Sequence, residues 1–242
     1  VHFFKCRAMG QPPKREIERL KREKREAKAA RKRKENTRDI IVRFLIVCEG
    51  QKTEPNYFKA LIDNHYSEVR DVEAEIRGQG CSTCALVERA KEIRDNLEKE
   101  RELGFDRIWV VFDKDDFDDF NRAIDLAKSY GFGCAWTNEA FELWFLLHFQ
   151  YLDVPISRDA YISKLEKLIQ KRLNDSSFRY NKNDPSFCNI LKDHGDGILA
   201  KEYAKRLRSN HKDKDYANHN PCTRVDLLVE ELENPLSVLK NK

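Results

Sequence analysis

The stretch Phe44–Glu54, FLIVCEGQKTE, joins a continuous apolar run to a pair of acids. Five apolar residues stop abruptly at Glu49, and Gly50 follows. A short apolar run bounded by a glycine is typical of a fully buried strand in a parallel sheet. Such a strand would deliver the Glu49 carboxylate to the edge where the strand ends. The stretch therefore predicts a sheet with a polar group at its carboxyl edge.

The residues that follow alternate between strand and helix patterns. Strands are predicted at 40–48, 72–76, 107–113 and 134–137, and helices at 54–66, in the later part of 78–104, at 117–131 and at 139–149. Strands and helices in strict alternation favour a parallel sheet covered by helices on both faces. The sequence thus predicts an α/β fold.

Three segments are expected along the chain: a basic arm at 1–39, flexible or helical; an α/β core at 40–150; and a helical part at 151–242 that packs on the core. In the last segment, 161–173, 197–210 and 222–233 have helical patterns and are joined by polar loops.

Charge is distributed unevenly. The whole chain carries 46 Lys and Arg against 42 Asp and Glu, a formal net charge of +4. The first forty residues hold 15 basic and 6 acidic residues, so they carry +9 and the remainder carries −5. Two interpretations of the arm stay open: a solubilising tail, or an arm that contacts phosphates and releases counterions. In the second, the binding residues would be Lys21, Arg22, Lys24, Arg25, Arg31, Lys32, Arg33 and Lys34.

Composition argues for a cytoplasmic protein. The seven cysteines are an odd, scattered set, which favours a reducing compartment. No apolar run approaches the ~20 residues of a membrane span. Cys81 and Cys84 lack a second ligand pair, so we interpret them as ordinary reduced cysteines rather than a zinc site.

Carboxylates follow three of the predicted strands. Glu49 follows the first strand, Asp113 ends the third with Asp115 two residues later, and Glu139 and Glu142 open the helix after the fourth. In an open parallel sheet, ligands bind beyond the carboxyl ends of the strands. Clustered carboxylates repel one another unless a cation neutralises them, and hard oxygen ligands select Mg²⁺ or Mn²⁺. The pattern predicts a divalent metal site.

Neighbouring residues suggest phosphate chemistry at that edge. Gly50 would let the chain turn close to a phosphate, and Lys52 and Lys114 would balance its charge. Asp118 and Asp119 suit a helix start instead, and the role of Asp116 stays open. An EF-hand loop beginning at Asp113 is excluded, because its sixth position is Asp118 and not glycine.

Four motifs in order carry a resemblance to a known family: FLIVCEGQKTEPNYF, VVFDKDDF, NEAFELWFLLHF and NPCTRVDLLVEEL. The first two resemble the Toprim domain of topoisomerases, primases and OLD-type nucleases. Together, the four resemble the RloB family, Toprim-like proteins found near bacterial restriction and abortive-infection loci.

The resemblance implies a Toprim-like, Rossmannoid fold and a metal-dependent nuclease in anti-phage defence. It assigns catalysis and metal binding to Glu49, Asp113 and Asp115, with Glu54 and Glu142 as further metal ligands. Thr137-Asn138-Glu139 departs from the Ser-Asn-Pro that the family often shows.

We therefore expect an Mg²⁺- or Mn²⁺-dependent enzyme that cleaves DNA or RNA phosphodiesters. The rival hypothesis is a non-catalytic regulator or adaptor that binds nucleic acid or protein on the same scaffold. Hydrolysis of free nucleotides is a third option, which the basic arm disfavours. Partner proteins of a defence system and a homo-oligomer are further expectations. The segment 141–149 is apolar nearly all round, which predicts either burial in the core or a dimer contact. His148 in that segment is expected to be a hydrogen-bonded core residue, with a catalytic role as the alternative.

Overall fold

A computed structural model describes residue 24 and residues 41–66, 72–80, 83–115 and 117–240. The chain divides into two units, Val1–Ile40 and Ile41–Lys242, and the elements below belong to the second. The predicted basic arm lies outside the described residues, apart from Lys24, which is exposed. The nucleic-acid-binding residues predicted in the arm therefore remain predictions.

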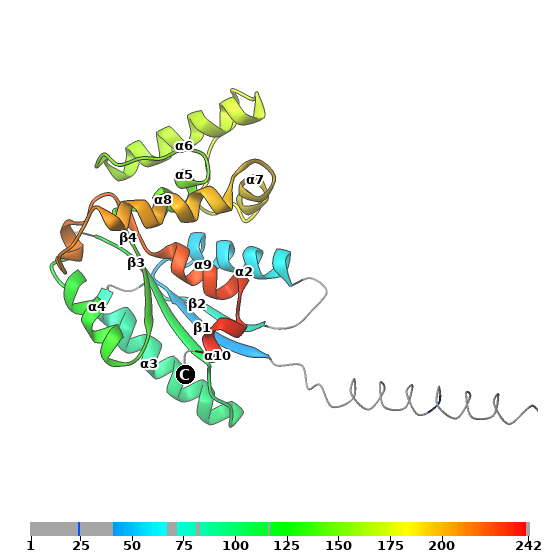
Figure 1. The fold of residues 1–242 in the computed structure, drawn as a ribbon, viewed down its shortest axis with the longest axis vertical. Coiled ribbons are helices and arrows are strands. Elements are labelled where there is room, and N and C mark those ends of the chain that lie inside the picture. Colours follow the sequence, from blue (N-terminus) through cyan, green and yellow to red (C-terminus); the bar gives the residue numbers. More distant parts are fainter. Residues whose placement is uncertain (1–23, 25–40, 67–71, 81–82, 116, 241–242) are drawn as a thin grey trace, which may run out of the picture. The chain divides into compact units, whose positions relative to one another are not determined.

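A five-stranded sheet forms the centre of the second unit (Figure 1). Its order is β2 (Val72–Gly78), β1 (Val42–Cys48), β3 (Arg107–Asp113), β4 (Gly133–Asn138) and β5 (Cys222–Thr223). The first four strands are parallel, and β5 pairs antiparallel with the end of β4. The predicted α/β class and the four parallel strands are confirmed.

Helices cover both faces of this sheet, as predicted. One face packs against α3 (Thr83–Arg101) and α4 (Phe120–Ser129), whose buried side chains join Leu45, Val47 and Val110 in one core cluster. The other face carries α2 (Thr53–His65) and α5 (Glu142–Leu147). The alternation of side chains along each buried strand supplies both clusters, since successive residues point to opposite faces.

The C-terminal part adds four longer helices and one short one to the α2 and α5 side (Figure 1), and a short 3-10 helix that packs against α4 on the other side. They are α6 (Arg158–Leu173), α7 (Phe187–His194), α8 (Gly197–Ser209), the 3-10 helix η1 (Tyr216–Asn218), α9 (Val225–Glu233) and α10 (Leu236–Lys240). Two differences from expectation appear here. Residues 222 and 223, expected in a helix, form β5, and α7 lies where a polar loop was expected.

Burial within the chain accounts for the apolar composition of the segment that begins at residue 141. All six residues of α5 are buried, with Leu143 and Trp144 at 0% exposure. Trp109 and Trp136 are core residues as well, as predicted. A partner copy is not needed to cover this helix.

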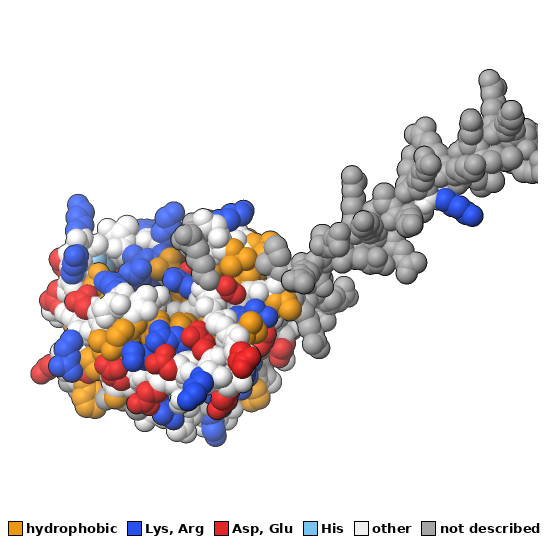
Figure 2. All heavy atoms as spheres, turned by 90° about the horizontal axis from the view of Figure 1, so that it is seen from below, with side chains coloured by type: hydrophobic (Ala, Val, Ile, Leu, Met, Phe, Trp, Pro, Cys, Tyr) orange, Lys and Arg blue, Asp and Glu red, His pale blue; other side chains and the backbone are white. Residues whose placement is uncertain are grey.

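The described surface is mixed in charge. On the face that Figure 2 shows, the coloured side chains of Lys and Arg alternate with those of Asp and Glu, with apolar groups between them. No helix in the described part of the chain is both long enough and apolar enough to span a membrane.

Candidate active site

The predicted acids lie where the strand order reverses. The chain runs from β1 to β2 on one side and then crosses to β3 on the other, so the carboxyl ends of β1 and β3 flank the switch point. Open α/β sheets bind ligands in the crevice at such a point. Glu49 follows β1 directly, and Asp113 is the last residue of β3.

Backbone hydrogen bonds fix the first two acids. The Glu49 N–H donates to the Val111 carbonyl at 2.8 Å, which extends the β1–β3 ladder past the end of β1. The Asp113 N–H donates to Glu49 Oε2 at 3.2 Å. Burial raises the pKa of Glu49 to about 7, assisted by the negative charges of Asp115 and Glu54 and opposed by the Asp113 N–H.

Asp113 faces the start of α5. Its Oδ2 accepts the Phe141 N–H at 3.0 Å. Shielding from water raises its pKa well above the ordinary value, and the charges of Glu54 and Glu142 add to that shift. The carboxyl group is therefore held among like charges that favour its neutral form.

Glu54 lies in the first turn of α2, and its carboxylate is close to Gly50. Its Oε1 accepts the Gly50 N–H at 3.3 Å. A Cβ at residue 50 would lie 2.0 Å from Glu54 Oε2, so a side chain there would displace the carboxylate. The position of the Glu54 carboxylate therefore depends on glycine at residue 50. Burial, with the charge of Glu142, raises the pKa of Glu54.

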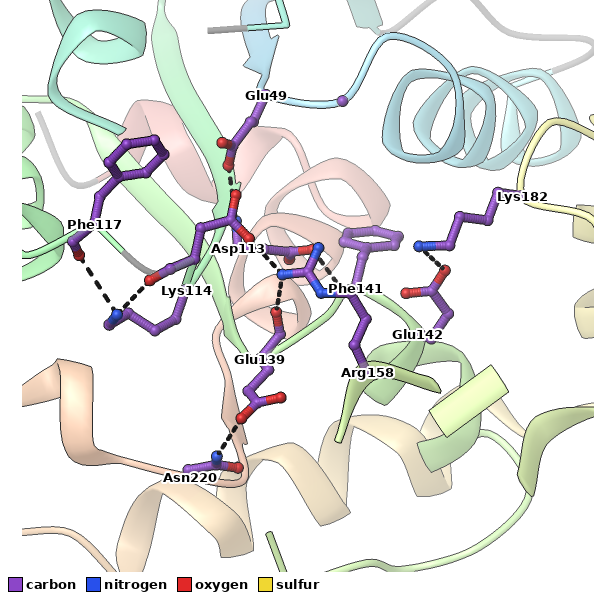
Figure 3. A network of polar contacts seen from close by, with 12 residues as sticks. Glu49, Asp113, Lys114, Phe117, Glu139, Phe141, Glu142, Arg158, Lys182 and Asn220 are labelled. Carbon is purple, nitrogen blue, oxygen red and sulfur yellow. Dashed lines mark hydrogen bonds and ion pairs between the residues drawn. The ribbon is translucent and has the colours of Figure 1, made fainter. Parts of the chain in front are cut away.

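Asp115 and Glu142 are paired with cations from the C-terminal part, and Figure 3 shows Lys182 beside Glu142. Arg158, at the start of α6, donates to Asp115 Oδ1 at 2.5 Å and to the Glu139 carbonyl at 3.0 Å. Lys182 lies 3.2 Å from Glu142 Oε1, which also accepts the Tyr180 hydroxyl at 3.1 Å. The loop that carries Lys182 is tied to α2, because Thr53 Oγ1 donates to the Lys182 carbonyl at 3.0 Å.

All five predicted acids line one cavity of about 230 Å³, hereafter the acid cavity. Its described lining holds five carboxylates, namely Glu49, Glu54, Asp113, Asp115 and Glu142, but only two cations, Arg158 and Lys182. The formal balance is three negative charges in a partly desolvated space.

This donor set suits a hard divalent ion, since it consists of carboxylate oxygens without thiols or imidazoles. In the described residues, no three acid, His or Cys side chains already converge to ligand distance. Between the described residues, the contacts of each of four acids reach one carboxylate oxygen: Glu49 Oε2, Glu54 Oε1, Asp113 Oδ2 and Glu142 Oε1. The residues fit Mg²⁺ or Mn²⁺ in kind and in charge, and binding requires side-chain rotations.

A scan against models of protein families matches residues 44–232 to the RloB-like protein model. The chain belongs to the RloB-like family. The match covers β3, all of β1 except its first two residues, all five acids and both cations. Searches of curated proteins and of solved structures found no match.

Other predicted site residues of this RloB-like chain lie elsewhere. Lys52 is exposed, and it is not part of the acid cavity lining. Lys114 turns away from the acids and donates to the carbonyls of Asp115 and Phe117. Asp119 precedes α4 as expected, but its Oδ2 accepts the Cys84 N–H at the start of α3. His148 is buried, with its Nδ1 2.9 Å from the Trp144 carbonyl, as a core histidine should be.

Sequence reasoning did not find Arg158, Tyr180 or Lys182. Each lies in a polar stretch of the C-terminal part, more than forty residues after Asp113, and no recognisable motif surrounds it. The weak signal that existed is the Ser157-Arg158-Asp159 helix start, where Ser157 Oγ accepts the Ala160 N–H at 3.4 Å. That signal predicts a helix and does not indicate which sheet edge the helix faces.

Proposed function

We propose that this chain is an Mg²⁺- or Mn²⁺-dependent nuclease of the Toprim type that cleaves phosphodiester bonds of nucleic acid in anti-phage defence. The observation that carries the proposal is the gathering of five carboxylates around one cavity at the sheet switch point, with two cations between them. The family membership adds the expectation of defence, which rests on the resemblance alone.

Glu49 is the group best suited to move a proton. A carboxyl with a pKa near 7 holds and releases a proton at neutral pH, which suits a general acid or base. Its Oε2 is oriented by the Asp113 N–H, so Oε1 faces no protein partner in the described part of the chain. Water or a leaving oxygen at Oε1 would exchange a proton with it.

The remaining acids suit metal binding, and the two cations suit phosphate binding. Asp113, Asp115, Glu54 and Glu142 would hold the divalent ion, which when bound activates water and stabilises phosphoryl charge. Arg158 and Lys182 each reach the cavity from outside the sheet, and their charges suit the non-bridging oxygens of a phosphate. A phosphate arriving there would take over these cations and free Asp115 and Glu142 as ligands.

One test uses the full chain with labelled single- and double-stranded DNA, tRNA and total RNA, in Mg²⁺, Mn²⁺ or EDTA. We expect cleavage with either ion and none in EDTA. We also expect Mn²⁺ to raise the melting temperature, equivalent to about 2.7 kcal/mol at a concentration one hundred times its dissociation constant. The Asp113→Asn/Asp115→Asn variant should stay folded and lose both effects. A variant that keeps the thermal shift would place the ion elsewhere.

The adaptor hypothesis has one observation in its favour. The Arg158–Asp115 and Lys182–Glu142 pairs join the C-terminal part to the sheet edge, as a purely structural contact would. If the wild type cleaves nothing with any ion, adding lysate from phage-infected cells decides the matter. Cleavage that appears with the lysate identifies a missing trigger, and continued inactivity together with tight nucleic-acid binding supports the adaptor.

A further inference from the structure

A second, larger cavity adjoins the acid cavity. It measures about 880 Å³, which is in the range of sites that take nucleotide-sized ligands. It shares Asp115 and Arg158 with the acid cavity, and the rest of its wall includes Phe117, Asn218 and Asn220. Because two residues belong to both linings, a ligand that reaches the acids through this opening would fill both spaces. We call this space the side cavity.

Phe117 is the unusual member of the side cavity. Its side chain is 55% exposed, and among the large apolar residues that stand exposed in the described chain it is the aromatic one. Exposing a Phe costs apolar burial, about 1.5–3 kcal/mol relative to a core position. The Lys114 ammonium donates to the carbonyls of Asp115 and Phe117 (Figure 3), which braces the turn that presents the ring.

The opposite part of the wall is built from amides. Asn220 Nδ2 makes a single weak bond to Glu139 Oε1 at 3.4 Å, and its Oδ1 is shielded from solvent without a partner in the described structure (Figure 3). The torsion that turns an amide about its Cβ–Cγ bond is soft. A small turn would bring the Asn220 amide to a ligand that offers N–H and acceptor groups in one plane.

Arg158 stands at the junction of the two cavities. It is bonded to Asp115 on the acid side and to the Glu139 carbonyl on the other. Partial burial lowers the pKa of Arg158, but the negative charges of Asp113 and Asp115 together with the bond to Asp115 outweigh it and raise the pKa. A planar guanidinium in this position can hold a phosphate whose attached nucleoside lies in the side cavity.

We propose that the side cavity takes one unpaired nucleobase of the substrate strand, stacked on Phe117, with its edge at Asn220 and its phosphate at Arg158. The proposal deepens the nuclease hypothesis and rests on it for the position of the scissile bond. Each of the four bases offers an N–H group on the edge that pairing would occupy, so the substrate is single-stranded at this nucleotide. Stacking on an aromatic ring tolerates any base, which predicts little sequence preference.

The test compares two oligonucleotides of equal length and charge, a single strand with bases and the same strand with abasic sites throughout. Binding of the full chain is measured by fluorescence anisotropy in EDTA, so that nothing is cleaved. Any phosphate contact that the basic arm makes would contribute equally to both, because the two strands carry the same phosphates. The ratio of the two dissociation constants therefore isolates the base.

We expect wild type to prefer the strand with bases, and Phe117→Ala to reduce that preference by about 5- to 150-fold, the range of one base–aromatic stack. Phe117→Trp should keep it. Ile198→Ala, which removes an apolar side chain that is 71% exposed on α8, should leave the ratio unchanged. Equal ratios for wild type and Phe117→Ala, or no preference in wild type, would overturn the subsite.

The outcome is separable from that of the nuclease proposal. Glu49→Gln should keep the preference for bases, since stacking does not involve that carboxylate. A Phe117-dependent preference in a chain that never cleaves would keep the subsite and remove the nuclease. Metal-dependent cleavage with a Phe117-independent ratio would do the reverse.

Discussion

Two shielded acids in this molecule, Asp226 and Asp113, have opposite electrostatic surroundings. Asp226, in α9, is fully buried, and its two oxygens accept bonds of 2.5 and 2.7 Å from Arg208. At the carboxyl edge of the sheet, Asp113 instead adjoins Glu54 and Glu142, and no cation is paired with it in the described residues. Asp226 is therefore paired with one cation, whereas Asp113 is one of several acids that outnumber the cations around them.

The difference separates a structural role from a binding role. A paired buried acid is neutral as a unit and ties α8 to α9. An unmatched cluster destabilises the metal-free fold, and it is kept only where a ligand supplies the missing positive charge. On this basis we propose a binding role for the acid cavity and a structural role for the Arg208–Asp226 pair.

The largest expected effect concerns the unmatched group. Glu49→Gln keeps the size and the hydrogen bond from the Asp113 N–H but removes the negative charge. Loss of a general acid or base costs about 10²- to 10⁴-fold in rate, and a weakened metal site adds to that loss. Initial cleavage rates with Mn²⁺ measure it.

The matched control is Glu100→Gln, an exposed acid on α3 that should cleave at the wild-type rate. Nucleic-acid binding by Glu49→Gln should be largely intact. A Glu49→Gln enzyme that cleaves as fast as the control would remove this carboxylate from the mechanism.

The second effect concerns the matched acid. Asp226→Asn leaves the Arg208 guanidinium against a neutral amide, and breaking a buried pair from one side costs about 3–5 kcal/mol. The low end is expected, because the Arg208 side chain is 21% exposed. In the metal-free protein, Asp113→Asn should cost little or stabilise, since it relieves repulsion. Urea unfolding in EDTA compares the two variants, and equal destabilisation would erase the distinction between the two groups.

The sequence predicted the parallel sheet because each strand carries its own signal. The apolar run of β1, the alternation in β2 and the run that ends at Asp113 are local patterns, and the rule of parallel crossovers then brings their carboxyl ends together. The sequence did not predict β5. Two residues, Cys222 and Thr223, have no periodicity of their own, and they are a strand only because the edge of β4 is adjacent.

The acids of the site were predictable for the same reason, since four of the five lie within one residue of the start or end of a regular element. Arg158 and Lys182 were not, because their position depends on how α6 and the following loop pack on the sheet. The direction of Lys114 was missed as well. An extended loop would point it toward a phosphate, but two backbone carbonyls of its own turn capture its ammonium.

The smallest expected effect is a pH dependence of the metal-free protein that the unmatched group imposes. The folded chain holds the Glu49 proton up to a pKa of about 7, whereas the unfolded chain releases it near the ordinary value of 4.5. Between these values the folded state binds more protons, so Glu49 favours folding at low pH and its contribution is lost as pH rises toward 7. The slope stays below about 1.4 kcal/mol per pH unit, because water screens this partly exposed group.

Buried His148, whose pKa is lowered to about 4, acts in the opposite sense between pH 4 and 6.5, so the pH dependence of wild-type stability alone does not isolate Glu49. The difference between wild type and Glu49→Gln removes the His148 contribution. Urea midpoints in EDTA from pH 5 to 8 should show wild type losing stability relative to Glu49→Gln as the pH rises to about 7 and levelling off above it, with Glu100→Gln parallel to wild type. Parallel curves for all three proteins would mean that Glu49 titrates as an ordinary surface acid, and the contrast with Asp226 would then rest on Asp113 and Glu54 alone.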